Sequence, residues 1–237
     1  MSTHETNSLT TAKSAHAAAE TARSDREQAG FTIWCDFGGV LSPALGRAFD
    51  DVSNAVGVPW ETLFGAAHLV AQELGHEALQ PLELGLISQD EWADRITEKL
   101  GSGVSWKTSL RDFDKHYYGQ RSIDATLLNE LHVFRARGIP VGLLTNSVLE
   151  WEAHREVLLQ PFEPFDYYLR SHEVRLAKPD PAIYELADTL LGHPGSRRIL
   201  IDDLAPNCAA ATAHGWLAIE HSDTPDTIRQ LHALIGD

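Results

Sequence analysis

The stretch IWCDFGGVLSP, residues 33–43, combines an apolar run, an aspartate directly after it and two consecutive glycines. The β-branched and aromatic residues before Asp36 are typical of a buried strand. A single aspartate at the end of a strand is common, because aspartate also caps helices at such junctions. This stretch becomes informative because other apolar runs, further along the chain, end on polar side chains in the same way.

Two later apolar runs share this feature: Thr145 follows VGLL, and the pair Asp202 and Asp203 follows ILI. From residue 122 onward, apolar runs alternate with segments of helical periodicity, which predicts parallel strands joined by right-handed crossovers. The runs lack alternation of apolar and polar residues, as expected when both faces of a sheet are covered. The sequence therefore predicts an α/β fold with a doubly wound, Rossmann-like parallel sheet. The expected strands are 31–36, 139–147, 165–171, 197–203 and 216–222, and the expected helices among them are 123–138, 178–192, 206–215 and 226–236.

A segment of different character interrupts this alternation after the first strand. Apolar residues recur at helical spacing in residues 61–75, and Ser88 followed by Glu91 forms a capping box that predicts a helix over 88–101. No strand is expected there. We therefore expect a mobile N-terminal tail, an α/β core domain and an inserted α-helical cap domain. Their predicted boundaries are 1–29 for the tail, 30–46 and 119–237 for the core, and 47–118 for the cap.

The composition excludes several classes of partner. There are 19 Lys and Arg residues against 34 Asp and Glu, a formal net charge of -15, which argues against nucleic acid or an anionic membrane surface. An anionic substrate would need a locally positive site. No apolar stretch reaches the ~18 residues of a membrane span. Cys35 and Cys208 cannot form a disulfide framework, and we interpret them as buried thiols of a cytoplasmic protein. The sequence does not predict an oligomeric state.

The polar groups at the strand ends suit phosphoryl transfer. In a parallel sheet they point into one crevice, together with Lys178 from LAKPDP. Converging carboxylates repel each other unless a hard cation neutralises them, and oxygen ligands favour Mg²⁺. An aspartate that faces phosphorus can attack it and form an aspartyl-phosphate, while a hydroxyl and a lysine stabilise the phosphate oxygens. Tandem glycines would let the backbone turn sharply and approach the metal closely.

Four stretches, in this order, resemble the haloacid dehalogenase superfamily: DFGGV (36–40), LLTNS (143–147), AKPDPAIY (177–184) and IDDLAPN (201–207). A further stretch, LELGLISQDEW (82–92), is similar to the cap of the subgroup whose helical insertion follows the first strand. That subgroup contains the phosphatase domain of soluble epoxide hydrolases and sugar-phosphate phosphatases. The resemblance implies a hydrolase, and more specifically a magnesium-dependent phosphatase.

The resemblance also implies roles for individual residues. Asp36 would be the nucleophile and a metal ligand, with the carbonyl of Gly38 also on the metal. Asp203 would bind Mg²⁺ directly, and Asp202 directly or through water. The implied catalytic residues are Asp36, Thr145 and Lys178; the implied phosphate-binding residues are Gly39, Thr145, Asn146 and Lys178; and Asn207 would support the site. Arg47, soon after the first motif, is a further candidate for contact with an anionic group of the substrate.

One position departs from the family pattern. Phosphatases of the family usually carry a second aspartate, as general acid and base, where this chain has Gly38. Such proton transfer contributes ~10²–10⁴ in rate.

Three hypotheses remain. We predict a working Mg²⁺-dependent phosphatase of a small phosphorylated metabolite, such as a sugar phosphate. Protons would then move through a cap residue such as His68 or His76 or through water, or no transfer would be needed. A metal-free dehalogenase is disfavoured by the adjacent Asp202 and Asp203. A catalytically impaired binding protein is the remaining alternative.

Overall fold

A parallel five-stranded sheet forms the centre of the computed structural model, which describes residues 30–162, 165–191 and 196–236. The strand order is β3-β2-β1-β4-β5, so the first strand of the chain is the central one. Each strand predicted from the sequence is present, and the predicted tail at 1–29 lies outside the described residues. The strands are β1 (Phe31–Cys35), β2 (Val141–Thr145), β3 (Tyr167–Arg170), β4 (Arg197–Asp202) and β5 (Leu217–Glu220).

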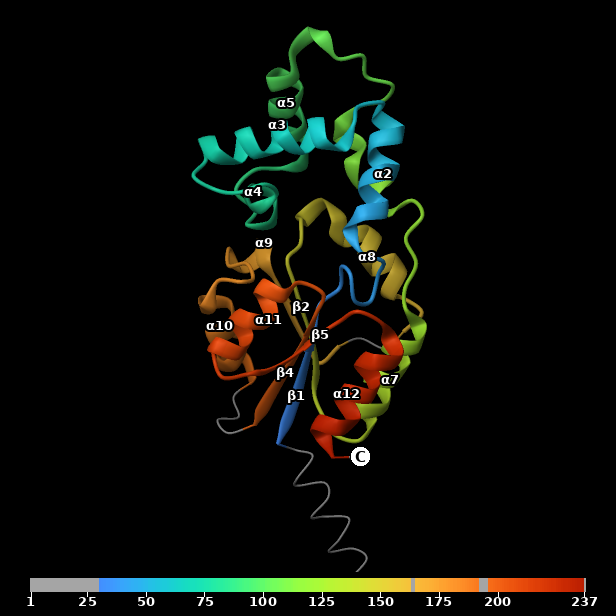
Figure 1. Ribbon diagram of the computed structural model, residues 1–237, viewed down its shortest axis with the longest axis vertical. Helices are drawn as coiled ribbons and strands as arrows, with labels where there is room; N and C mark the ends of the chain where they lie inside the picture. The colour runs from blue at the N-terminus through green and yellow to red at the C-terminus, as the bar shows by residue number, and fades with distance from the viewer. Residues whose placement is uncertain (1–29, 163–164, 192–195, 237) are drawn as a thin grey trace, which may run out of the picture.

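Helices cover both faces of the sheet, which confirms the predicted doubly wound fold. Helices α7 (Ala125–Ala136) and α12 (Thr224–Ile235) lie on one face, and α10 (Pro181–Leu191) and α11 (Ala205–Ala213) on the other (Figure 1). Successive strand residues point to opposite faces. Ile33 and Cys35 therefore join one apolar core, whereas Trp34 joins the other. Both cores need apolar residues, which explains why the strands lack alternation.

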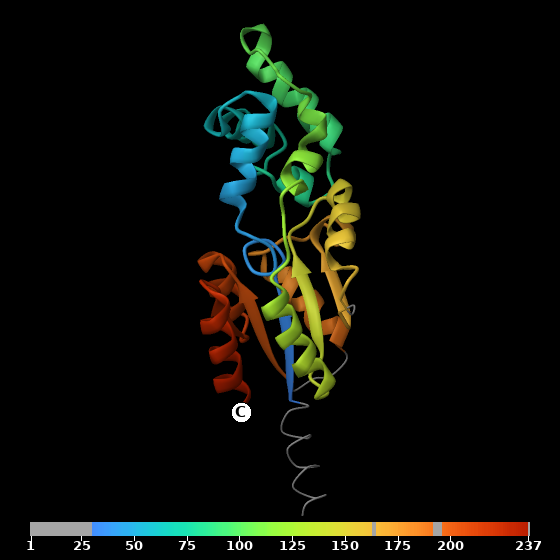
Figure 2. The same cartoon turned by 90° about the vertical axis from the view of Figure 1, so that its right-hand side faces the viewer.

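A group of helices interrupts the chain between β1 and β2, as the sequence predicts. Its members are α2 (Leu45–Val56), α3 (Trp60–Glu73), α4 (Gln80–Glu83), α5 (Gln89–Leu100) and α6 (Phe113–Tyr118), here called the cap. Residues 45–118 contain no strand. The Ser88 side chain accepts a hydrogen bond from the Glu91 N–H at 3.2 Å, so this helix begins at the predicted capping box. The cap stands over the carboxyl ends of the strands (Figures 1 and 2).

The cap is packed onto the core through one continuous apolar cluster. Phe113 of α6 stacks on Trp151 at a ring distance of 5.5 Å, and Trp151 lies in a 3-10 turn (Leu149–Trp151) before α8 (Glu152–Leu159) of the core. The Trp151 indole N–H donates to the buried side chain of Gln89 at 2.7 Å. Apolar stacking and this buried hydrogen bond together hold the cap against the strand ends.

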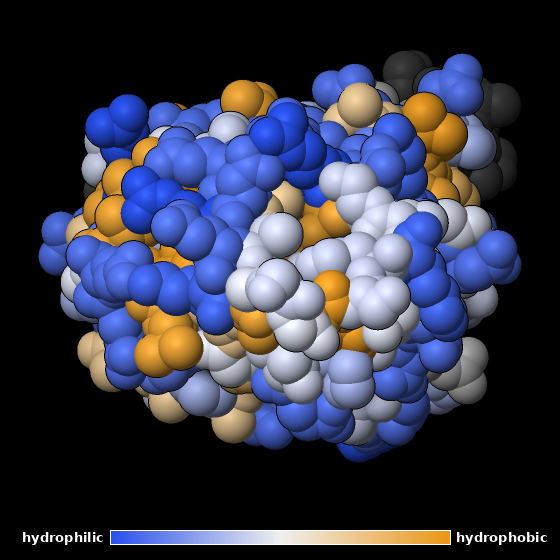
Figure 3. All heavy atoms as spheres, turned by 90° about the horizontal axis from the view of Figure 1, so that it is seen from above, coloured by the Kyte–Doolittle hydropathy of each residue, from blue (hydrophilic) through white to orange (hydrophobic). Residues whose placement is uncertain are grey.

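The outer surface of the cap is mainly hydrophilic. Figure 3, which views the molecule from the cap end, shows polar residues broken by smaller apolar groups. Phe64, Leu69 and Leu86 are the large apolar side chains of the cap that are exposed, among the residues that the structure describes. In the same residues, no helix combines the length and the apolar character that crossing a membrane requires. The apolar material of the cap thus faces the core, where it can shape a site.

Candidate active site

Polar side chains meet where three neighbouring strands end. Asp36 directly follows β1, Thr145 is the last residue of β2, and Asp202 is the last residue of β4. Because β1 lies between β2 and β4, these residues and the following Asp203 border one place. Asp36, Asp202 and Asp203 each offer a carboxylate oxygen, and these three atoms lie within 4.8 Å of one another. The predicted convergence of acids from opposite ends of the chain is therefore present.

Lys178 lies at the centre of this group. Its Nζ contacts Asp202 Oδ2 at 2.5 Å and Asp36 Oδ1 at 3.1 Å, and it donates to the Leu144 carbonyl at 2.8 Å. The side chain is buried. Burial lowers the pKa of Lys178, but Asp36 and Asp202 raise it by more, so that the net shift is upward. Lys178 is therefore a fixed positive charge beside Asp36.

The carboxylate of Asp36 has one engaged oxygen and one open oxygen. Oδ1 accepts the Phe37 N–H at 2.7 Å and faces Lys178. Within the described part of the chain, Oδ2 has no hydrogen-bond partner. Burial, above all, raises the pKa of Asp36; Lys178 opposes this shift, and Asp202 adds to it. An oxygen that faces a cavity with no donor on it is available to attack an electrophile.

Both carboxylate oxygens of Asp202 are engaged by neighbouring residues of the site. Oδ2 pairs with Lys178, while Oδ1 accepts from the Leu204 N–H and from the Asn207 side-chain amide, both at 2.9 Å. The residue is fully buried. Asp202 thereby fixes Lys178 and the turn into α11, and Asn207 lies where a supporting residue is expected. A direct metal contact from Asp202 stays a prediction.

Asp203 carries a negative charge that nothing in the described residues pairs. Burial first, then Asp36 and Asp202, raise the pKa of its carboxyl to about 6. The donor atoms gathered here are all oxygens, which is the ligand set that Mg²⁺ prefers. A cation between Asp36 and Asp203 would offset the unpaired charge, so the residues present fit a magnesium ion.

The loop after Asp36 brings the backbone close to Asp203. Gly39 has φ +80, and its N–H donates to the Ser42 carbonyl at 2.8 Å. A Cβ on Gly39 would lie 1.9 Å from Asp203 Oδ2. The second glycine of the pair is thus required both by backbone conformation and by space. Because its N–H is already used, a phosphate contact by Gly39 stays a prediction.

We expect Gly39→Ala to lower stability and to weaken metal binding. A left-handed backbone costs an alanine about 1–2 kcal/mol, and the new methyl group must displace the Asp203 carboxylate. The matched control is Gly65→Ala in α3, where a Cβ meets nothing within 4 Å and should stabilise the helix by ~0.5–1 kcal/mol. Thermal unfolding with and without Mg²⁺ checks both variants. A Gly39→Ala protein as stable as the control would contradict this account.

Asn146 lines the cavity, and its side-chain amide is hydrogen-bonded to the backbone of Lys178. Its side-chain Oδ1 accepts the Lys178 N–H and its Nδ2 donates to the Lys178 carbonyl, both at 2.9 Å. The amide therefore positions the Lys178 loop. Thr145 is buried beside it, with its hydroxyl 3.3 Å from the Asn146 carbonyl. Phosphate contacts by Thr145 and Asn146 stay predictions.

The sequence did not single out three charged residues that line the same cavity: Glu83 of α4, Arg121 and Arg155. Arg155 is buried, forms an ion pair with Glu152 and lies 4.8 Å over the Phe37 ring. The Arg121 guanidinium lies 4.4 Å from the Tyr117 ring centre. These arginines and Lys178 bring three positive charges to the cavity, beside the carboxylates of Asp36, Glu83 and Asp203.

Two other candidates, both histidines, are not among the described residues that line this cavity. His68 and His76 are absent from its lining, and His68 instead contacts Gln72 at 3.0 Å. Arg47 lies in α2, and its side chain is outside the described residues. The cap residue that faces Asp36 is therefore a glutamate, not one of the histidines considered from the sequence.

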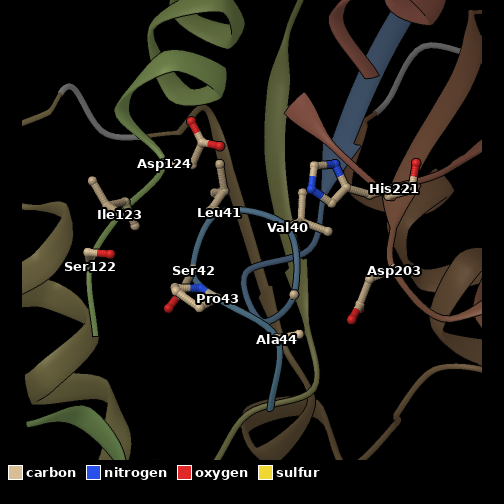
Figure 4. Close-up of a pocket in the computed structure, with 12 residues that line it drawn as sticks. Val40, Leu41, Ser42, Pro43, Ala44, Ser122, Ile123, Asp124, Asp203 and His221 are labelled. Atoms are coloured by element: carbon tan, nitrogen blue, oxygen red, sulfur yellow. The ribbon is translucent and has the colours of Figure 1, made fainter. Parts of the chain in front are cut away.

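The cavity itself is small, with a volume of about 90 Å³, whereas small-molecule sites usually measure ~300–1,000 Å³. Its roof is formed by Leu79, Tyr117, Tyr118 and Trp151. A larger cavity of about 570 Å³ is lined by the Gly39–Ala44 loop (Figure 4), and Asp203 borders both cavities. Among the residues whose side chains are described, that second cavity is lined by Asp124, Asp203 and His221 and by no lysine or arginine. A phosphate is therefore expected in the smaller cavity.

Comparison with known proteins identifies the family. Residues 32–215 match the model of the haloacid dehalogenase-like hydrolases. The chain belongs to this family. It is 25% identical over 214 residues to bifunctional epoxide hydrolase 2 of Rattus norvegicus, an alignment that covers 85% of this chain and 38% of that protein. It is 24% identical over 165 residues to sesquiterpene phosphatase astK of Aspergillus oryzae, covering 69% and 82% respectively. The chain thus spans well under half of the rat relative.

The fold agrees with that of solved haloacid dehalogenase family enzymes. The enzyme bt-2542 from Bacteroides thetaiotaomicron superposes with a TM-score of 0.65 at 23% identity, covering 84% of this chain and 97% of that one. The same enzyme has been solved with magnesium and inorganic phosphate, with a TM-score of 0.57 and 22% identity, covering 81% and 93%. Likeness at this identity shows the fold of this haloacid dehalogenase-like hydrolase.

Proposed function

We propose that this hydrolase is a Mg²⁺-dependent phosphatase of a small phosphorylated metabolite and acts through an aspartyl-phosphate on Asp36. The observation that carries the proposal is the environment of Asp36. One of its oxygens is fixed by Phe37 and Lys178, the other is open, and Asp203 supplies an unpaired carboxylate nearby. The magnesium and phosphate complex of the Bacteroides enzyme and the phosphatase from Aspergillus support this assignment.

In the proposed reaction each residue of the site has a separate role. Lys178 holds Asp36 and offers its positive charge to the phosphate, and the Thr145 hydroxyl donates to a phosphate oxygen. Asp36 Oδ2 then attacks phosphorus, and water later hydrolyses the acyl-phosphate. Mg²⁺, held by Asp36, Asp203 and the Gly38 carbonyl, would supply charge neutralisation and orientation of the phosphate. The cap excludes bulk water while the bond is transferred.

The small cavity limits the substrate. With the cap docked as described, about 90 Å³ is enclosed, and its roof is largely aromatic. A substrate whose leaving group exceeds this volume would need the cap to move away from the core. We propose a phosphomonoester of a small metabolite, with sugar phosphates as one class. The two buried free thiols, Cys35 and Cys208, suit the reducing cytoplasm that we propose as its location.

Magnesium is expected to stabilise the protein more at high than at low pH. A carboxyl whose pKa rises on folding stabilises the folded state while it is protonated. For Asp203 this stabilisation is lost as the pH rises from the pKa of the unfolded chain through the folded pKa of about 6. A bound cation offsets that loss. At ten times its dissociation constant it should raise the melting temperature by about 3–6 °C. Calorimetry at about pH 5 and about pH 8, with Asp203→Asn as the insensitive control, checks this.

A phosphate-release screen against small phosphorylated metabolites tests the proposal directly. Release that depends on Mg²⁺ and is abolished by a chelator is the expected result. Halide release from 2-haloacids in the presence of chelator would instead indicate a dehalogenase. Binding of phosphorylated ligands with no turnover on any of them would indicate an impaired binding protein, an alternative that the glycine at position 38 keeps open.

A further inference from the structure

A carboxyl group of the cap faces the nucleophile from across the small cavity. Glu83, the last residue of α4, lines this cavity together with Asp36, Gly38 and Lys178. Gly38 occupies the position without a proton-transferring side chain. Glu83 is the only carboxylic acid of the cap that borders the cavity, among the residues described. Gly38, which lacks the usual carboxyl group, and Glu83, which carries one, therefore border the same cavity.

The cap presents Glu83 through contacts that exist only when it is docked. The Ser171 hydroxyl, at the start of α9 (Ser171–Val174) on the core, donates to the Glu83 carbonyl at 2.5 Å. Two residues later, Gly85 has φ +61, and a Cβ there would lie 2.9 Å from the His172 carbonyl. This close approach requires glycine. The backbone that follows the Glu83 side chain is thus fixed against the core.

Resting on the phosphatase function proposed above, we propose that Glu83 is the general acid and base of the reaction, delivered by the cap in place of the residue missing at Gly38. Its side chain touches the leaving group, so it is a catalytic residue. The chemistry matches a site whose core supplies the nucleophile and whose cap supplies the proton. Closure of the cap then completes the catalytic group.

The proton moves in two steps. In the first, Asp36 Oδ2 bonds to phosphorus, the bond from phosphorus to the leaving oxygen breaks, and that oxygen takes the proton of the Glu83 carboxyl to leave as an alcohol. In the second, the Glu83 carboxylate accepts a proton from water as the water oxygen bonds to phosphorus. The bond from phosphorus to Asp36 breaks, which releases inorganic phosphate and restores both carboxyl groups.

The surroundings of Glu83 suit a group that both gives and accepts a proton. Burial and the charge of Asp36 raise the pKa of Glu83 to about 7, against the opposing effects of Lys178 and the Asn146 amide. A general acid works best with a pKa near the working pH. The cavity also holds the charged groups Asp36, Asp203, Lys178, Arg121 and Arg155 and the phenols Tyr117 and Tyr118. His172 lies on α9, against which α4 packs.

The first turnover of Glu83→Gln on two kinds of substrate tests the proposal. The leaving oxygen of an alkyl phosphate is basic and needs a proton. The p-nitrophenolate anion is a good leaving group without protonation. We expect the rate of aspartyl-phosphate formation to fall ~10²–10⁴-fold with the alkyl phosphate and less than about tenfold with p-nitrophenyl phosphate. Rapid quench of a single turnover measures both rates. Glu98→Gln, an exposed glutamate of α5, is the matched control and should retain both rates.

A second variant separates proton transfer from packing. The φ of Gly38 lies outside the left-handed region, so a side chain there would not strain the backbone conformation. Gly38→Asp in the Glu83→Gln background should restore the alkyl rate, because it returns a carboxyl to the cavity. Equal losses on the alkyl and the aryl substrate, or no loss on either, would overturn the role of Glu83 while the phosphatase assignment stands. A wild-type protein that hydrolyses no phosphomonoester would overturn both.

Discussion

Asp36→Asn should abolish phosphate release, with a loss of at least ~10³-fold in kcat. Asparagine keeps the shape and the hydrogen bond from the Phe37 N–H, but its amide cannot act as the attacking oxygen. The fold should persist, because burial disfavours the charged form of Asp36 and the variant places a neutral group there. Phosphate release under saturating substrate and Mg²⁺ measures the effect, and circular dichroism verifies the fold.

A chemical trap gives the complementary result. In the wild-type protein, quenching during turnover should leave a phosphorylated protein that hydroxylamine cleaves, as expected of an acyl-phosphate. The Asp36→Asn protein should retain no label. Substantial turnover in the variant, or label that survives in it, would place the nucleophile at another residue and would require a new assignment of the cavity.

Lys178→Met should produce the largest loss of stability, about 3–5 kcal/mol. The variant removes the positive partner of two buried carboxylates, Asp36 and Asp202, and leaves them facing each other. The loss should shrink as the pH falls, because protonation removes the uncompensated charges. Denaturant unfolding at about pH 5 and about pH 8 measures the free energies of unfolding. Turnover should also be lost, since the phosphate would no longer meet the lysine.

Two matched variants make this result specific. Lys115→Met removes an exposed, solvent-screened ion pair with Asp112 and should leave the free energy of unfolding nearly unchanged. Asp202→Asn combined with Lys178→Met should recover part of the stability, because one unpaired charge is gone. If Lys178→Met and Lys115→Met proved equally mild, the buried ion pairs would not be what holds the strand ends together.

The sheet and its acids follow from local pattern. Each strand was foreseeable because a covered parallel strand must be apolar on both faces, and Asp36, Thr145, Asp202 and Asp203 directly follow or end such strands. Parallel pairing then brings the strand ends to one edge. The helical insertion was also predictable, from periodicity and from the Ser88 capping box. These features depend on neighbours in the sequence or on the regularity of the sheet.

Other parts of the site depend on how the cap docks, which no local pattern encodes. Glu83 ends a helix of four residues, and its carboxyl reaches the cavity because Ser171 and His172, far away in the sequence, fix the backbone around it. In the local sequence, only Gly85, two residues later, sets Glu83 apart, and a nearby glycine does not distinguish it from a surface glutamate. The pairing of the Asn146 amide with the Lys178 backbone was likewise hidden, because the motif alone does not show where a side chain points.

The central place of β1 has a consequence for biosynthesis. Both partners of this strand come much later in the chain, starting at residues 141 and 197. While the ribosome elongates the polypeptide, the apolar segment Phe31–Cys35 has emerged without either neighbour. Its side chains stay exposed and its backbone unpaired with other strands until most of the protein exists. Nascent chains interrupted before β4 should therefore be prone to aggregation and to engage chaperones, whereas completed ones should fold.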